Sequence, residues 1–174
     1  MRAFFRSFCA FLALTLACGL PAAHAAPVQP DKQARGTVRV VNGIFVRKIQ
    51  DLNFATIGQW SGAGTATVNP DTDVMTTTGG VAFLSGFPYA AQFEAVSPVK
   101  GVVIIRIPNK PITITRVSGT ETMTIDTWTL SGNSRRTVAA QEPFAFKIGG
   151  TLRIGANQAE GLYVGTFDVD IQYP

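Results

Sequence analysis

Cysteine and histidine are almost absent from this sequence. Its 174 residues include two cysteines and one histidine, and all three lie near the N-terminus, at Cys9, Cys18 and His24. Beyond residue 25 the chain has no thiol for a disulfide or a nucleophile, and no imidazole for a metal site or a Ser-His-Asp triad. Carboxylate, lysine, tyrosine and hydroxyl groups remain for catalysis. We expect a protein that is not an enzyme and that holds no cofactor or metal.

The N-terminus has the layout of a cleaved secretory signal peptide. Arg2 and Arg6 form a positive region, residues 8–20 form a short apolar run, and residues 23–25 supply an A-x-A cleavage site. Cleavage there would remove both cysteines and the histidine. Two alternatives stay open: an uncleaved membrane anchor, for which the apolar run is short, and a lipoprotein attached through Cys18. The main reading places the protein in the periplasm, at the cell surface or outside the cell, with no membrane span in the mature chain.

The charge of the predicted mature chain is nearly balanced. Subtracting Arg2 and Arg6 from the 15 basic residues leaves 13, against 11 acidic residues. The basic residues are scattered apart from two adjacent pairs, so no stripe follows the spacing of nucleic-acid phosphates. The sequence therefore does not indicate a nucleic-acid partner.

Short runs rich in Val, Ile, Thr and Phe follow one another from residue 36 onward, with Gly, Pro, Asn and Ser between them. Such a pattern predicts an all-β sandwich or barrel. We divide the chain into a signal peptide (1–25), a flexible lead-in (26–35) and a single β-sandwich domain (36–174). The predicted strands are 37–46, 52–57, 65–68, 80–84, 91–96, 101–107, 112–117, 121–130, 143–148, 151–154 and 163–172.

The last predicted strand has the cleanest alternation in the chain. Phe167, Val169 and Ile171 alternate with Asp168 and Asp170, and successive strand side chains point to opposite faces. We expect the three apolar residues in the core, the two aspartates in water, and the strand in the centre of its sheet. A pair of adjacent carboxylates could also serve glycosidic cleavage, but a solvated strand face explains them better.

Three other groups of residues carry alternative readings. The oxygen-rich residues 69–73 suggest either a calcium loop or, better, a polar turn, because the glycine and distal glutamate of a full calcium loop are missing. Arg135 and Arg136 suggest a solvated loop tip rather than an anion site. Aromatic side chains could stack on sugar rings or belong to the core. Trp60, Phe87 and Tyr89 are the candidate glycan contacts, whereas Trp128 lies within a β-like run.

The chain resembles a group of secreted bacterial domains that are catalogued only as a domain of unknown function. The motifs that carry the resemblance are DLNFATI (51–57), GTATV (64–68), TGGV (78–81), AQF (91–93), MTID (123–126), IGGTL (148–152) and IGANQAEGLYVGTF (154–167). The resemblance implies an exported, immunoglobulin-like antiparallel β-sandwich with no assigned enzymatic activity.

The two ends of the domain are also similar to those of chaperone–usher fimbrial subunits, which often end in an alternating strand with a penultimate tyrosine and a glycine 14 residues from the end. Here Tyr173 is penultimate and Gly161 is the 14th residue counted back from Pro174. Residues 37–46 alternate like an N-terminal donor strand that joins a neighbour by β-strand addition. The chain differs from many such subunits in lacking their cysteine pair.

These observations favour a secreted cell-surface structural or adhesive subunit, fimbria-like, that assembles by β-strand pairing. The resemblance implies the same protein or other surface subunits as partners, and a periplasmic chaperone. The alternative function is a carbohydrate-binding module. The candidate assembly strand comprises Thr37, Val38, Val40, Ile44 and Val46. The candidate terminal-strand motif comprises Gly161, Phe167, Val169, Ile171 and Tyr173.

Overall fold

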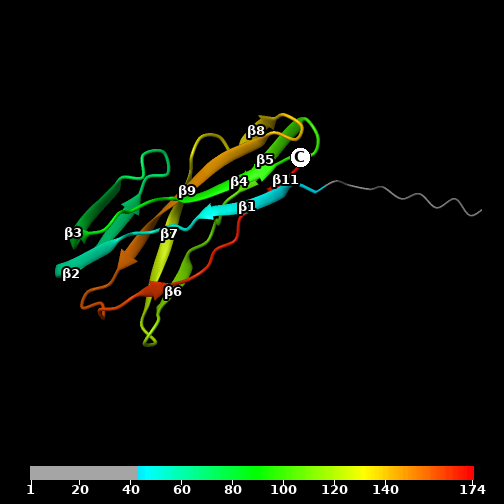
Figure 1. The fold of residues 1–174 in the computed structure, drawn as a ribbon. Helices are drawn as coiled ribbons and strands as arrows, with labels where there is room; N and C mark the ends of the chain where they lie inside the picture. Colours follow the sequence, from blue (N-terminus) through cyan, green and yellow to red (C-terminus); the bar gives the residue numbers. More distant parts are fainter. Residues whose placement is uncertain (1–42) are drawn as a thin grey trace, which may run out of the picture. The chain divides into compact units, whose positions relative to one another are not determined.

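A computed structural model describes residues 43–174, without the side chain of Ser61 (Figure 1). This part of the chain contains eleven strands and no helix. The strands are β1 (Phe45–Gln50), β2 (Thr56–Val68), β3 (Met75–Ser85), β4 (Ala91–Val96), β5 (Gly101–Arg106), β6 (Ile112–Arg116), β7 (Thr122–Leu130), β8 (Arg135–Val138), β9 (Pro143–Ile154), β10 (Tyr163–Val164) and β11 (Asp170–Gln172). The predicted signal peptide, the lead-in and the start of the first predicted strand lie outside the described residues.

The strands form two antiparallel sheets, as the predicted all-β sandwich requires. The larger sheet has the order β1-β4-β9-β7-β6-β10, and β2 pairs with both β9 and β3; the smaller sheet has the order β11-β5-β8. Strand β9 joins the parts of the larger sheet, because its first half pairs with β4 and its second half with β2. The prediction of two separate strands at 143–148 and 151–154 was wrong: they are two halves of β9.

Strand β9 changes its pairing partner at its middle, where Gly149 and Gly150 lie. A side chain on Gly149 would meet the carbonyl oxygen of Val68, and one on Gly150 would lie 3.1 Å from Ile125 Cγ2 and 3.3 Å from Trp128 Cε3. Gly149 therefore permits a close approach to Val68 that a larger residue would block, and Gly150 lies in tight contact with the side chains of Ile125 and Trp128.

Two apolar clusters make the core, one on each half of β9. The first cluster takes most of its buried side chains from β2, β3, β6, β7 and the second half of β9. The second cluster lies between β4 and the first half of β9 on one side and the small sheet on the other. Phe93 and Phe146 stack within it at 5.4 Å between ring centroids.

The final segment differs from the single central strand that its alternation predicted. Strand β10 is the outermost strand of the large sheet and β11 is an outer strand of the small sheet, so the chain between them crosses from one sheet to the other. The predicted faces are confirmed: Ile171 is buried, Phe167 and Val169 pack against the second cluster, and Asp168 and Asp170 are exposed.

Candidate assembly site

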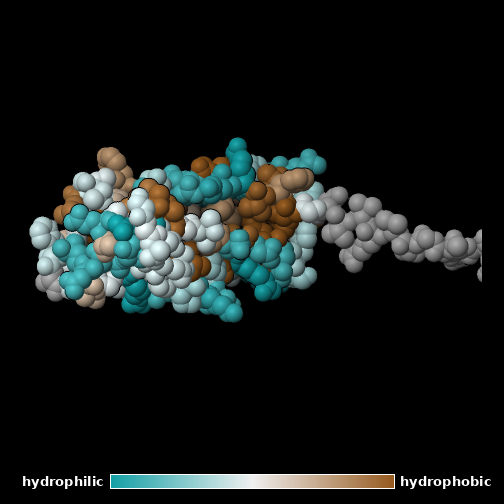
Figure 2. All heavy atoms as spheres, turned by 90° about the horizontal axis from the view of Figure 1, so that it is seen from below, coloured by the Kyte–Doolittle hydropathy of each residue, from teal (hydrophilic) through white to brown (hydrophobic). Residues whose placement is uncertain are grey.

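Strand β1 is an exposed edge at one end of the large sheet. It pairs with β4 through Phe45↔Val96 and Val46↔Ala95, and it has no partner on its other side within residues 43–174. Residues 45–49 are all exposed, and Phe45 keeps 76% of its surface in water. Figure 2 shows apolar surface gathered at the right-hand end of the domain, where Figure 1 places β1. An edge of this kind offers unpaired backbone groups beside apolar side chains.

Two ion pairs and an irregularity limit what this edge can bind. Arg47 Nη2 lies 2.9 Å from Glu94 Oε1 on the neighbouring strand, and Lys48 Nζ lies 2.6 Å from Asp51 Oδ1. The pairing register with β4 shifts at Ile49. Charged side chains and bulges are common means of discouraging unwanted pairing at a sheet edge.

The structure describes two of the five candidate assembly-strand residues. Ile44 is half-buried against the second cluster, and Val46 belongs to β1 and pairs with β4 in its own domain. Thr37, Val38 and Val40 lie outside the described residues. The C-terminal end of the candidate assembly strand is therefore used within the domain, and only residues before β1 stay available as a donor.

The residues of the candidate terminal motif have structural roles inside the domain. Gly161 adopts φ +146°, and a side chain there would lie 2.9 Å from Arg116 Cδ. Arg116 is held in place by two hydrogen bonds to Glu121, of 2.7 and 2.9 Å, and by one of 3.1 Å to the Glu160 carbonyl oxygen. The hydrogen bond from Arg116 lowers the pKa of Glu121. Gly161 thus gives the chain room to pass this arginine.

Tyr173 attaches the C-terminal end of the chain to Ser97. Its hydroxyl lies 2.9 Å from Oγ of Ser97, which is fully buried and donates a 2.6 Å hydrogen bond to the Val99 carbonyl oxygen. Nearby, the Phe167 ring packs between Trp128, at 4.8 Å, and Phe93, at 6.3 Å. The terminal segment therefore closes the core.

The candidate glycan contacts divide into two kinds. Trp60 and Phe87 are exposed over 72% and 86% of their surface, whereas Tyr89 is half-buried and its backbone pairs with Asn53. Trp128 contacts both core clusters, and its Nε1 donates a 3.2 Å hydrogen bond to the Lys110 carbonyl oxygen. Two of the three candidates are thus free to meet a ligand, and Trp128 belongs to the core.

Residues 69–73 form a polar turn between β2 and β3. Asn69 Oδ1 accepts hydrogen bonds from the backbone amides of Asp71, at 2.8 Å, and Thr72, at 3.3 Å. Asp73 pairs with Lys147 on β9 and accepts a 2.9 Å hydrogen bond from the Ala90 amide. Burial alone raises the pKa of Asp73, but these two hydrogen bonds outweigh it and hold the pKa below the ordinary value of 3.8. Asn69 therefore shapes the turn itself, whereas Asp73 connects the turn to β9 and to Ala90.

The prediction that Arg135 and Arg136 form a solvated loop tip was wrong for Arg136. Both residues begin β8, and Arg136 is half-buried. Its guanidinium donates hydrogen bonds to the carbonyl oxygens of Asn133, at 2.7 Å, Ala145, at 3.1 Å, and Ser131. Burial lowers its pKa. Arg135 is exposed, as predicted.

Strand β3 was not identified from the sequence as a long edge strand. It begins five residues before the predicted start at residue 80, and it pairs only with β2 among the described residues. The run of threonines at 76–78 is the signal that could have extended the prediction, since threonine favours strands.

The fold and its edges define an all-β protein of the antiparallel sandwich class. The described residues contain no helix that is long and apolar enough to cross a membrane. The model of the family described as "Domain of unknown function (DUF4402)" matches residues 44–173, so the chain belongs to this family. The predicted resemblance to a domain of unknown function is confirmed. Searches of curated proteins and of solved structures found no match.

Proposed function

We propose that this protein is an exported cell-surface structural or adhesive subunit, fimbria-like, that assembles by β-strand pairing. The observation that carries the proposal is strand β1, which is paired on one side only and exposed from Phe45 to Ile49. It directly follows the alternating residues 37–44. A chain that adds a strand to a neighbour gains main-chain hydrogen bonds, while every second side chain supplies specificity.

The partners that fit this proposal are further copies of the same protein or other surface subunits. An exposed apolar segment with unpaired backbone groups is also an aggregation hazard before assembly, which supports a periplasmic chaperone as a transient partner.

Export rests on the signal-peptide pattern of the first 25 residues. N-terminal sequencing of protein from the periplasm or medium should find Ala26 first, and an intact Met1 in the cytosol would contradict export.

Assembly is tested by substitutions in the residues before β1. We expect the exported protein to form oligomers that dissociate when Val38 and Val40 are both changed to aspartate, because charges would then occupy one face of the added strand. The matched control changes Gln29 and Gln33 to aspartate in the lead-in and should leave oligomers intact. Size-exclusion chromatography over a range of concentrations gives the readout. A wild-type protein that stays monomeric throughout, with and without a native surface extract, would refute the proposal.

A carbohydrate-binding module is the second candidate, because Trp60 and Phe87 are both strongly exposed at β2 and just after β3. Exposed aromatic rings can stack on sugar rings. Soluble glycans should then quench tryptophan fluorescence in the wild-type protein but not in a Trp60→Ala variant. The fluorescence of Trp128, which packs against both core clusters, should not respond to glycans. If soluble glycans leave the tryptophan fluorescence unchanged, the carbohydrate-binding function is contradicted and assembly remains the proposed function.

A further inference from the structure

Five strands in the described part of the chain are paired on one side only: β1, β3, β8, β10 and β11. Four of these strands have a feature that discourages an additional strand from pairing with them. Strands β10, β11 and β8 have two, three and four residues, and β8 begins with two arginines. Strand β1 carries Arg47 and Lys48 and has the register shift at Ile49. Shortness, charge and bulges are the devices that keep natural edges from pairing.

Strand β3 differs from these four edges in its length and charge. It has eleven residues, Met75–Ser85, with no charged residue and no proline. The larger irregularity of its pairing with β2 leaves residues 60–63 of β2 opposite Gly80 alone, beside Gly79 at φ +72°. A smaller shift follows near Leu84. A long uncharged edge of this kind is the template that an added strand uses.

One face of β3 also has apolar surface for an added strand to cover. Val81 is buried in the first core cluster, and Phe83, two residues further on, shares its face but is 47% exposed. The cross-strand partner of Phe83 is Ile57, which packs against the same cluster. A strand lying along the free side of β3 with apolar residues at alternate positions would cover the exposed flank of Phe83.

We infer that the open edge of β3 is the acceptor for residues 37–42 of a second copy of this protein. This inference rests on the proposed assembly function and names its binding site. The donor residues Thr-Val-Arg-Val-Val at 37–41 place Val38 and Val40 on one face, which matches the alternation that Val81 and Phe83 require. The added strand would give β3 the second partner that it lacks.

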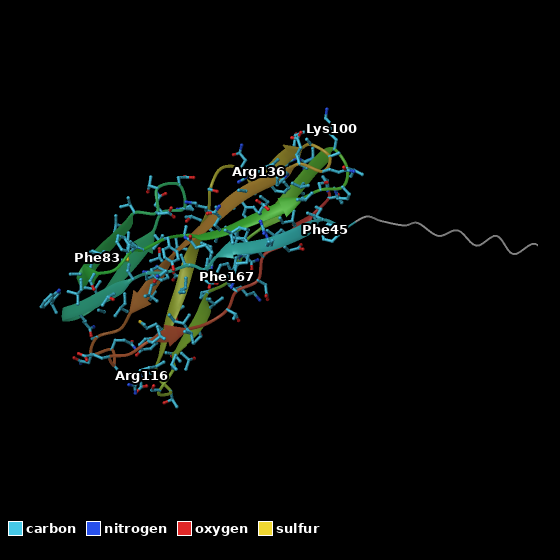
Figure 3. The ribbon with its side chains drawn as sticks, in the orientation of Figure 1. Phe45, Phe83, Lys100, Arg116, Arg136 and Phe167 are labelled. Atoms are coloured by element: carbon cyan, nitrogen blue, oxygen red, sulfur yellow. The ribbon has the colours of Figure 1, made fainter. Side chains whose placement is uncertain are left out.

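The position of the donor favours a second copy over the same chain. The donor, residues 37–42, ends two residues before β1, which begins at Phe45. Figure 3 shows Phe45 and Phe83 at opposite ends of the domain. A donor at one end and an acceptor at the other make a head-to-tail contact. Such contacts between identical copies build open chains when the rotation between copies does not close a ring.

The absence of cysteine after residue 18 makes disulfide trapping a clean test. In a background where Cys9 and Cys18 are serine, one preparation of the full chain carries Arg39→Cys, on the donor face opposite to Val38 and Val40. It is mixed under oxidising conditions with preparations that carry Thr78→Cys or Ala82→Cys on β3, on the face opposite to Val81 and Phe83. Matched controls carry Arg47→Cys on β1 or Thr137→Cys on β8, both of which are exposed edge positions. Tags of different size distinguish mixed dimers from dimers of one variant.

We expect mixed dimers of Arg39→Cys with one or both β3 variants, and their loss when Val38 is changed to aspartate in the donor. Mixed dimers with the β1 or β8 controls instead would overturn β3 as the acceptor while leaving strand-pairing assembly standing. Failure of every pair, with a monomeric wild-type protein, would overturn both. A disulfide that forms within one chain carrying Arg39→Cys and Ala82→Cys, at a rate independent of concentration, would show that the chain fills its own edge.

Discussion

The first and last strands of the described domain both lie at sheet edges, yet their side chains are placed very differently. Strand β1 keeps all residues from Phe45 to Ile49 exposed. The segment through β10 and β11 packs Phe167 and Ile171 against the second core cluster and fastens Tyr173 to Ser97. The C-terminal edge therefore contributes to the stability of the domain, whereas the exposed N-terminal edge contributes little to the core.

The largest expected difference between the two edges concerns one pair of isoleucines. Ile171 in β11 is 9% exposed and Ile49 in β1 is 45% exposed. Ile171→Ala should lower the free energy of unfolding by about 2–5 kcal/mol, because it leaves a cavity in the core. Ile49→Ala should change it by less than about 0.5 kcal/mol. Denaturant melts of both variants provide the measurement, and equal losses would remove the distinction between the edges.

A smaller effect is expected from the hydroxyl that anchors the C-terminus. Tyr173→Phe removes the 2.9 Å hydrogen bond to Ser97 but keeps the ring, and Ser97 still donates to Val99. The loss should be about 1 kcal/mol, as for a typical hydrogen bond. Tyr89→Phe is the control, since Tyr89 is fixed through its backbone pairing with Asn53. A Tyr173→Phe variant as stable as the wild type would show that the anchor contributes nothing.

Alternation in the sequence predicted which way side chains face, and it predicted less well which strands pair. It placed Ile171 inward and Asp170 outward correctly, because an extended chain keeps a period of two whether or not it is hydrogen-bonded. It could not show that the segment crosses between sheets. On this path the segment runs close to β6, because a Cβ added at Gly165 would lie 2.6 Å from Ile114 Cγ2 and 3.0 Å from the Thr113 carbonyl oxygen. That contact lies about fifty residues away in sequence.

The candidate site was predictable to a similar degree. Trp60 and Phe87 are exposed, as a ligand contact requires, whereas the valines before β1 lie outside the described residues and their role stays a prediction. The open edge of β3 was not recognised, because an edge is defined by the order of strands in a sheet and no local pattern encodes that order. The anchoring of Arg136 was missed for the same reason: its partner Ala145 lies on another strand.

Acid should weaken the attachment of the β2–β3 turn. Because the pKa of Asp73 lies below 3.8 in the folded protein, its contribution to stability is present above that value and is lost as the pH falls through the folded-state pKa. Asp73→Asn should therefore flatten the loss of stability from about pH 4 to about pH 2. Asp71→Asn, in the same turn, should leave it unchanged. Identical acid profiles for wild type and Asp73→Asn would contradict this role.

The smallest effect is expected at the ion pair that ties β1 to β4. Glu94→Gln removes the charge that faces Arg47 on a largely exposed surface. Such pairs contribute about 0.2–1 kcal/mol and are screened by salt. We expect a loss within that range that disappears in high salt, measured by denaturant melts at two ionic strengths. A larger, salt-independent loss would mean that β1 is held as firmly as β11.

Amide hydrogen exchange of assembled and dissociated protein tests strand pairing most directly, because it reports backbone hydrogen bonds residue by residue. The account predicts that amides within Met75–Ser85 gain protection on assembly, while those of β7, which already has partners on both sides, do not change. Assemblies in which no strand edge gains protection would show that the subunits associate through side chains alone and would contradict assembly by β-strand pairing.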